Sequence, residues 1–91
     1  MAMIRISPVG VDVRCGLFDG VPRSIRMGVE RVPVIRLARV RQERAAFPAA
    51  TGPRTLFEVD TPEARLALAF EHRTRRWSVE GMDPEARPGV T

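Results

Sequence analysis

Arginine is the residue type in this chain whose number and spacing are best suited to chemistry. The sequence contains fifteen arginines and no lysine, and two groups of them stand close together. The first group comprises Arg36, Arg39, Arg41 and Arg44, and the second comprises Arg73, Arg75 and Arg76. A guanidinium group binds phosphate through two parallel hydrogen bonds, and each neutralised phosphate adds to salt-dependent affinity. If both groups met on one rim of the fold, with Arg26 or Arg31, they would follow a nucleic-acid backbone.

The distribution of charge along the chain fits such a surface but has a second explanation. Residues 1–44 carry nine arginines and four acids, a net charge of +5, whereas residues 45–91 carry six arginines and seven acids, a net charge of −1. A surplus concentrated in one half can face a polyanion. The alternative is a solvated surface with local arginine–acid pairs worth less than about 1 kcal/mol each. A preference for arginine over lysine is itself typical of a genome rich in G and C.

The other residue types that could bind a metal or perform catalysis are too few or too isolated. A zinc site needs three or four nitrogen, sulfur or oxygen ligands, whereas the chain has one cysteine, Cys15, and one histidine, His72. Cys15 continues an apolar strand face, which favours a small buried side chain. The serines lie in no nucleophile motif, and the glycines form no phosphate-binding loop. We therefore expect no enzymatic activity, no metal and no cofactor.

Length and composition predict one domain without a membrane segment. Ninety-one residues are enough for a single small core, which we place in residues 1–83, followed by a loose tail at 84–91. No stretch approaches the roughly 18–20 apolar residues that cross a bilayer, and the first residues lack the apolar core of a signal peptide. A single cysteine cannot form an internal disulfide. These features predict a cytoplasmic protein.

The first half of the chain shows the two-residue period of β-strands. Apolar side chains alternate over residues 9–15, which predicts that Val9, Val11, Val13 and Cys15 share one face. Asp19-Gly20 and Gly28 predict tight turns on either side of a second strand. In the β-rich residues 32–40 the parity slips at 34–35, and Pro33 cannot donate a ladder hydrogen bond. We interpret this as a bulge or a sheet edge.

The alternation is lost over residues 41–53, which read as a long loop. A short helix over residues 38–47, ended by Pro48, is the alternative there.

Residues 61–72 support two interpretations. Thr61-Pro62-Glu63 is typical of a helix start, and the alanines that follow favour a helix. However, apolar side chains alternate over residues 66–70 in a strand pattern. A short polar connection then leads into residues 75–80, where Trp77 and Val79 share a face. Two strands joined by so short a connection make a hairpin, so we predict a strand, with a helix at 62–72 and an α+β fold as the alternative.

These patterns predict an all-β fold of about six short strands in meander order. Small antiparallel chains of this kind form an open barrel or a strongly bent sheet. The parities within each strand predict a core containing Val11, Val13, Ile25, Phe57, Leu68 and Trp77.

Residues 19–83 also resemble a short uncharacterised β-domain family of high-GC bacteria that is encoded near translesion DNA polymerases. The resemblance lies in Asp19-Gly20, Pro22, Ile25-Arg26-Met27-Gly28, Val34-Ile35-Arg36, Phe57-Glu58-Val59-Asp60-Thr61, Leu66-Ala67-Leu68 and Arg76-Trp77-Ser78-Val79. The chain departs from the family pattern in lacking further aromatic residues near positions 26–44. The resemblance implies an accessory role in tolerance of DNA damage.

The sequence therefore predicts a non-catalytic accessory module associated with DNA repair or translesion synthesis. The expected nucleic-acid-binding residues are the two arginine groups, and the expected partner is DNA or a DNA-polymerase-associated protein. The alternative is a protein-interaction or homo-oligomerisation module without nucleic-acid contact. An exposed strand edge within residues 32–40 would serve it through strand addition or a symmetric dimer.

Overall fold

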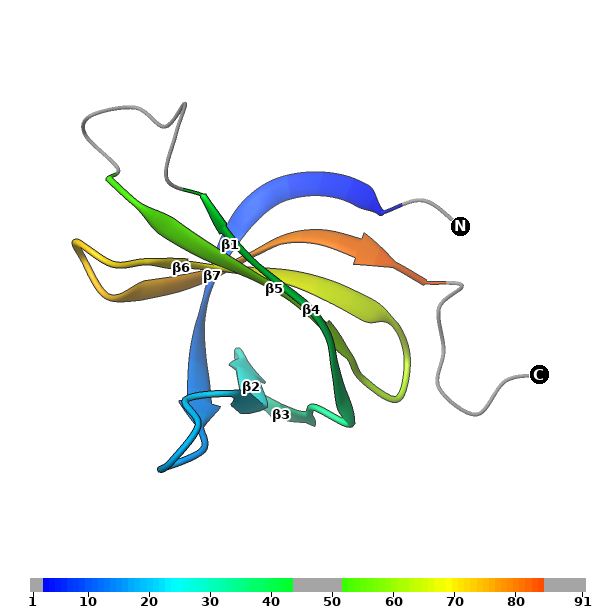
Figure 1. The fold of residues 1–91 in the computed structure, drawn as a ribbon. Coiled ribbons are helices and arrows are strands. Elements are labelled where there is room, and N and C mark those ends of the chain that lie inside the picture. Colours follow the sequence, from blue (N-terminus) through cyan, green and yellow to red (C-terminus); the bar gives the residue numbers. More distant parts are fainter. Residues whose placement is uncertain (1–2, 44–51, 85–91) are drawn as a thin grey trace.

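The fold is an antiparallel β-sheet, and the computed structural model describes residues 3–43 and 52–84 (Figure 1). The described residues contain seven strands and no helix, which confirms the all-β prediction. The strands are β1 (Ile4–Cys15), β2 (Pro22–Met27), β3 (Glu30–Pro33), β4 (Arg36–Glu43), β5 (Arg54–Asp60), β6 (Arg65–Glu71) and β7 (Arg76–Asp83). Because β6 occupies most of the ambiguous segment 61–72, the strand interpretation is confirmed and the helix is excluded.

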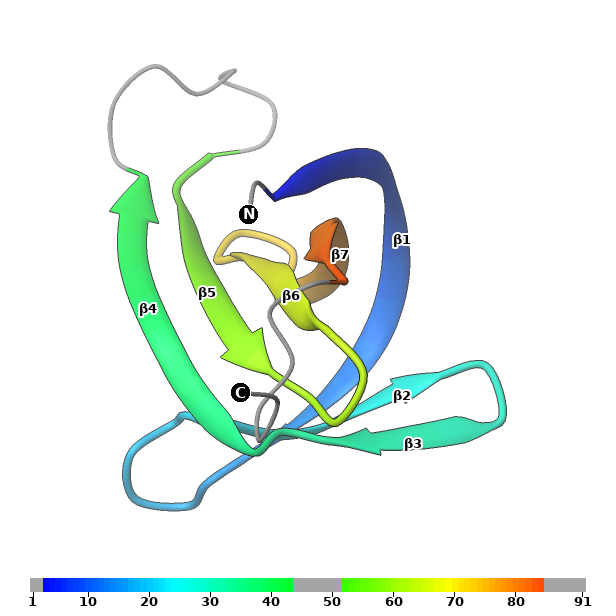
Figure 2. The ribbon, with the colours of Figure 1, turned by 90° about the vertical axis from the view of Figure 1, so that its right-hand side faces the viewer.

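All seven strands belong to one sheet in the order β3-β2-β1-β7-β6-β5-β4. The twelve-residue β1 is bent, so that its first part pairs with β7 and its last part with β2. The sheet curls into an open half-barrel, as predicted, with the β2–β3 hairpin lying across one end (Figure 2). The long strand β1 thus connects the two parts of the sheet.

Strands β3 and β4 follow one another in the chain but lie at opposite edges of the sheet. Two residues connect them. The Val34 N–H donates to the Arg23 carbonyl at 2.9 Å, and the Ile35 N–H donates to the Asp60 carbonyl at 2.7 Å. The connection therefore ties β2 to β5 and closes one end of the half-barrel.

The core lies on the face of the sheet that the half-barrel encloses. Ile25, Val59, Leu68 and Val79 are fully buried there. Of the six predicted core residues, Ile25 and Leu68 are buried, whereas the other four are half-buried against the same cluster. Those four are Val11, Val13, Phe57 and Trp77. Part of their surface stays exposed, because no second layer of described residues covers the half-barrel beside them.

Of three further local predictions, one needs correction and two are confirmed. The helix considered for residues 38–47 is wrong in its described part, because residues 38–43 belong to β4. The interruption expected around Pro33 is confirmed as a sheet edge, because the stretch 32–40 divides into the end of β3 and the start of β4, which are the two edge strands. Val9 and Val11 share one face of β1, as predicted, because Val9–Val79 and Val11–Trp77 are regular pairs, but Val9 remains 49% exposed.

Other predictions are confirmed or fall outside the described residues. The turns at Gly20 and Gly28 are present, and both glycines have the positive φ that such turns require. β7 continues beyond residue 80 to Asp83. The predicted tail lies outside the described residues from 85 onward, as does Arg44.

Candidate polyanion-binding surface

Arg36, the first arginine of β4, belongs to an ion-paired group on one face of the sheet. Arg36, Asp60 and Arg65 lie opposite one another on β4, β5 and β6. Asp60 is only 3% exposed, and its carboxylate accepts from Arg36 Nη2 at 2.8 Å and from Arg65 Nε at 2.7 Å. The hydrogen bond from Arg65, aided by Arg36, lowers the pKa of Asp60 although burial acts in the opposite direction. Arg36 therefore joins the strands rather than presenting a free charge.

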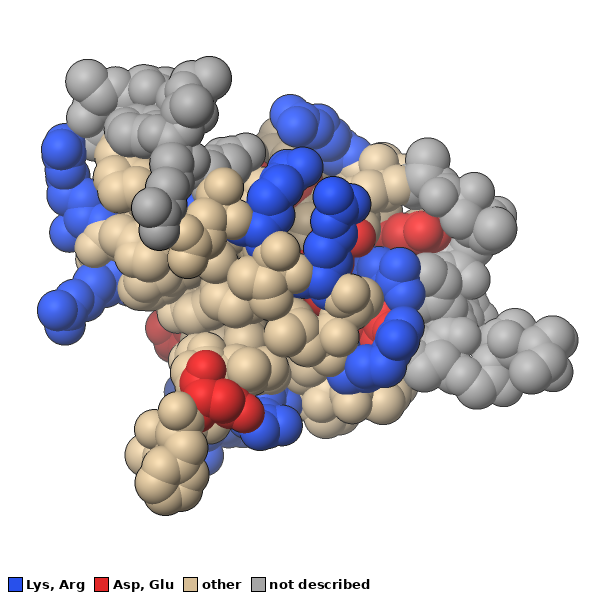
Figure 3. Space-filling view, viewed as in Figure 1, with Lys and Arg blue, Asp and Glu red and all other residues tan. Residues whose placement is uncertain are grey.

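Arg39 and Arg41 lie further along the same face of β4, beside a trough. This trough of about 510 Å³ is also lined by Arg5, Arg54, Glu58 and Glu80, and its floor includes Ala67 and Gly81. Arg54 forms an ion pair with Glu80. Acidic side chains thus lie among the basic ones, and Figure 3 shows red groups between and beside blue ones on this face.

A second group of arginines lines two adjoining hollows beside β1 and β2. The larger hollow, of about 600 Å³, is lined by Arg26, Arg75 and Arg76 together with Asp12 and Trp77. The smaller, of about 210 Å³, shares Asp12 and Arg26 with it and adds Arg14 and Arg31. We call these five arginines the basic surface: Arg14, Arg26, Arg31, Arg75 and Arg76. With Asp12 as the one acid among the lining residues, its net charge is +4 (five minus one).

The five guanidinium groups of the basic surface form no close ion pairs with the described residues, although Asp12 lies opposite Arg26 and Glu71 lies opposite Arg76 in the sheet. Arg26 and Arg31 even lie directly opposite each other on β2 and β3, where like charges repel. Asp12, the neighbour of Arg26 on β1, offsets part of this repulsion, and an anionic ligand would offset the rest.

The backbone of Arg75 is also strained. Arg75 ends the turn between β6 and β7, and its N–H donates to the Glu71 carbonyl at 2.8 Å. Its φ of 58° makes it the one non-glycine residue with positive φ in the described part of the chain. Glycine or asparagine usually occupies such a position, because a Cβ is strained there.

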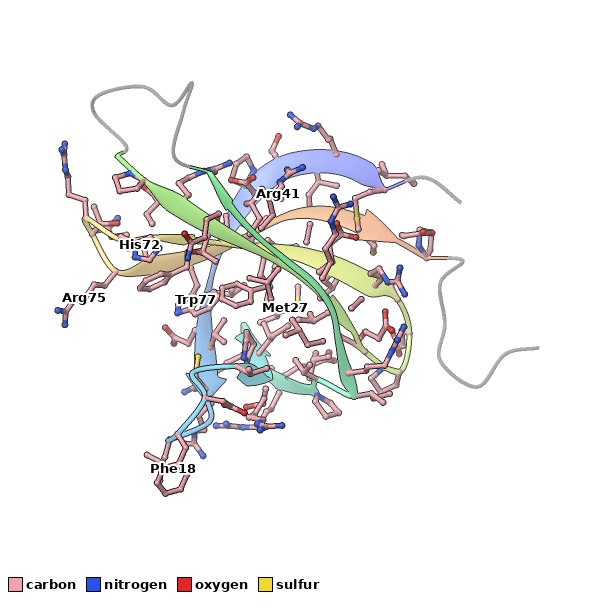
Figure 4. The ribbon with its side chains drawn as sticks, viewed as in Figure 1. Phe18, Met27, Arg41, His72, Arg75 and Trp77 are labelled. Atoms are coloured by element: carbon pink, nitrogen blue, oxygen red, sulfur yellow. The ribbon has the colours of Figure 1, made fainter. Side chains whose placement is uncertain are left out.

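The structure brings together only some of the residues expected from the sequence. Arg75 and Arg76 meet Arg26, as considered, but they do not meet Arg39 and Arg41, which line a different hollow. Figure 4 shows Arg75 and Arg41 on separate parts of the sheet. Arg73 lies beside Gly52 instead.

Arg14 is the member of the surface that sequence reasoning missed. Arg14 alternates with the valines of β1, so parity predicts that its side chain points away from their face. Parity does not predict which residues of β2 and β3 lie beside it.

The remaining reactive side chains take part in packing. Burial, followed by the charge of Asp19, raises the pKa of the Cys15 thiol and so disfavours its nucleophilic form. His72 Nε2 lies 2.6 Å from Thr55 Oγ1, and the imidazole contacts the edge of Phe70. In the described ranges, no three His, Cys, Asp or Glu side chains are grouped to hold a metal ion. No helix that could span a membrane occurs in these ranges either.

Comparisons with protein-family models, curated proteins and solved structures found no match. The resemblance to the high-GC bacterial family therefore stays a prediction. Function has to be argued from the basic surface and the sheet that carries it.

Proposed function

We propose that this protein is a non-catalytic, cytoplasmic accessory module that binds the phosphate backbone of DNA through the basic surface. A role in repair or translesion synthesis follows from the resemblance noted in the sequence. The observation that carries the proposal is the grouping of five arginines without ion pairs around a single acid, Asp12.

The chemistry of the basic surface favours contact with phosphates over reading of bases. Arginines spread over β1, β2, β3 and the β6–β7 turn can each meet a different phosphate of one backbone. Trp77 lines the larger hollow, but its ring packs on Phe57 and Phe70 with centroids 5.3 and 4.8 Å away. Its indole is therefore held in the core rather than offered to a base. We expect non-specific binding with a Kd of about 10⁻⁴ to 10⁻⁶ M.

The strained backbone at Arg75 also supports a functional role for this turn. Residues in sparsely populated backbone regions cluster at binding sites, where the surrounding structure holds them in place. Glycine would relieve the strain at this position, so the presence of arginine there is consistent with a role for its charge.

The proposal is tested by titrating a short fluorescent duplex and a single strand at two salt concentrations. Affinity should fall as salt rises, with a log–log slope of roughly 0.9 per neutralised phosphate on duplex and 0.7 on single strand. Replacing Arg26 and Arg76 together with alanine removes two contacts, so the duplex slope should decrease by about 1.8. The matched control replaces Arg39 and Arg41 with alanine, which should leave the slope unchanged.

Two results would overturn the proposal. One is the absence of binding at a low salt concentration of about 50 mM, where phosphate contacts are strongest. The other is an equal loss of affinity in both double variants, because net charge alone would then account for binding.

A protein-interaction module is the second candidate, favoured by different observations. The edge strand β4 has no partner on its outer side among the described strands. Leu17 and Phe18 at the β1–β2 turn are also fully exposed (Figure 4). Sedimentation over a range of protein concentrations would reveal self-association if this second function takes the form of a homo-oligomer.

A further inference from the structure

The smaller hollow of the basic surface lies on one face of β1, β2 and β3. Residues that pair directly across strands share a face, so the register sorts the side chains here into two rows. One row is Asp12, Arg26 and Arg31, and the other is Arg14, Ser24 and Pro33. The register shift between β1 and β2 lies beyond these rows, after Arg14. Three guanidinium groups therefore come from three neighbouring strands and line one hollow with the Ser24 hydroxyl.

Ser24 places a hydrogen-bond donor among these cations. Its side chain is half-buried, and its Oγ accepts a hydrogen bond from Arg31 Nη1 at 3.5 Å. A hydrogen bond of this length is weak, so Arg31 can turn to a better acceptor. The Ser24 O–H itself donates to no described residue. The hollow thus offers an anion both guanidinium groups and a hydroxyl.

The charge of the smaller hollow is that of a site for a dianion. Its lining contains three arginines and one acid, Asp12, which gives a net charge of +2. A phosphate within a nucleic-acid strand carries one negative charge and two unesterified oxygens. A phosphate monoester carries about −1.5 to −2 at neutral pH and has three acceptor oxygens. The monoester therefore complements three arginines better than an internal phosphate does.

We propose that the smaller hollow binds the terminal phosphate monoester of a DNA strand. The three arginines and the Ser24 hydroxyl donate to its oxygens. The strand continues into the adjoining larger hollow, where Arg75 and Arg76 contact the phosphates that follow. This inference rests on the proposed function and deepens it, because it makes the end of a broken strand the preferred ligand.

The proposal is tested with short single strands of one sequence, whose binding is followed by fluorescence anisotropy. One strand ends in hydroxyl groups, a second carries a 5′-phosphate and a third carries a 3′-phosphate. A fourth, hydroxyl-ended strand is one nucleotide longer, so that it gains an internal phosphate instead of a terminal one. One of the two phosphorylated strands should bind about threefold to tenfold more tightly than this longer strand.

Single substitutions assign the preference to the smaller hollow. Arg14 and Ser24 line this hollow but not the larger one, whereas Arg76 lines only the larger. Arg14→Ala should remove most of the preference for the terminal phosphate, and Ser24→Ala should reduce it by a smaller factor. Arg76→Ala is the matched control. It should weaken all four strands by a similar factor and leave the preference unchanged.

Inorganic phosphate distinguishes the strand end from the free ion as the ligand. Measured by nuclear magnetic resonance, inorganic phosphate should shift the Ser24 backbone amide only at concentrations far above those needed with the phosphorylated strand.

Three results would overturn the proposal. They are equal affinity for the phosphorylated strands and the longer hydroxyl-ended strand, full preference in Arg14→Ala, and binding of inorganic phosphate as tight as that of the strand. Binding of all strands without an end preference would contradict this inference alone. Absence of binding to any strand would contradict the proposed function as well.

Discussion

Asp60 shows how single arginines in this protein differ in role. Its buried carboxylate accepts hydrogen bonds from Arg65 at 2.7 Å and from Arg36, whose side chain is itself 63% exposed. These interactions connect three strands through one acid. Arg36 is ion-paired to its cross-strand neighbour Asp60, whereas Arg26 and Arg76 form no ion pair with any described residue although Asp12 and Glu71 lie opposite them. A cross-strand acid is therefore not sufficient for an ion pair, and the geometry of the two side chains decides.

Replacing Asp60 with asparagine should destabilise the fold in a pH-dependent way. At neutral pH the variant loses a charge-assisted interaction, and we expect the free energy of unfolding to fall by about 1–3 kcal/mol. The pKa of Asp60 is lowered in the fold from its ordinary value of 3.8. Its stabilising contribution is therefore present above that value and is lost as the pH falls through the lower folded pKa. Urea unfolding should show a gap between wild type and variant near pH 7 that closes toward about pH 2.

Asp19→Asn is the matched control for this residue. Asp19 forms an ion pair with Arg23 at 2.8 Å, but both side chains are well exposed. Its Oδ1 also accepts from the Val21 N–H, a bond that asparagine can keep. The expected loss is below about 1 kcal/mol. A gap for Asp60→Asn that stayed constant with pH would show that its effect is packing rather than charge.

The arginine pairing was beyond the reach of sequence reasoning for a physical reason. Arg36 and Asp60 are 24 positions apart, and only the register of β4 on β5 brings them together. Local parity shows which face a side chain occupies but not what stands beside it. Parity alone would place Arg36 and Arg39 on opposite faces, because they are three positions apart, and only the register shift between Leu37 and Arg39 sets both beside the same face of β5.

At the scale of elements, the β6–β7 hairpin could be predicted because its information is local. Alternating side chains on both sides of a short connection define the pairing, and Phe70 does lie opposite Trp77. The placement of β3 and β4 at opposite edges of the sheet was harder to predict from the sequence. Pro33 and the parity slip at residues 34–35 indicated an interruption, but the partners of the two strands lie far away in the chain.

Leu68→Ala should test the core that this hairpin builds. Leu68 is fully buried and lies opposite Phe57 on β5 and Val79 on β7. Truncating it leaves a cavity, and we expect a loss of about 2–5 kcal/mol in the free energy of unfolding. Val29→Ala, at an exposed turn, should have little effect. Thermal unfolding measures both, and a Leu68→Ala midpoint equal to that of wild type would contradict this view of the core.

At the scale of the whole molecule, the half-barrel separates two surfaces of different chemistry. The basic surface carries five arginines that form no ion pair with a described residue, while the edge strand β4 carries the exposed side chains of Arg39 and Val40. These surfaces belong to strands at opposite ends of the sheet order.

The same architecture predicts unusual protection of two backbone amides outside the strands. The N–H groups of Val34 and Ile35 donate to Arg23 and Asp60, and so join the two ends of the sheet order. If this end of the half-barrel is closed in solution, both amides should exchange with deuterium as slowly as those of β2 and β5, because opening them requires separating the strands. The amides of Phe18 and Val29, at the exposed turns, should exchange rapidly. Ile35→Pro removes the hydrogen bond to Asp60 and should speed deuterium exchange at the Val34 amide. Fast exchange of both amides in the wild type would contradict the prediction and show that this end of the half-barrel is open.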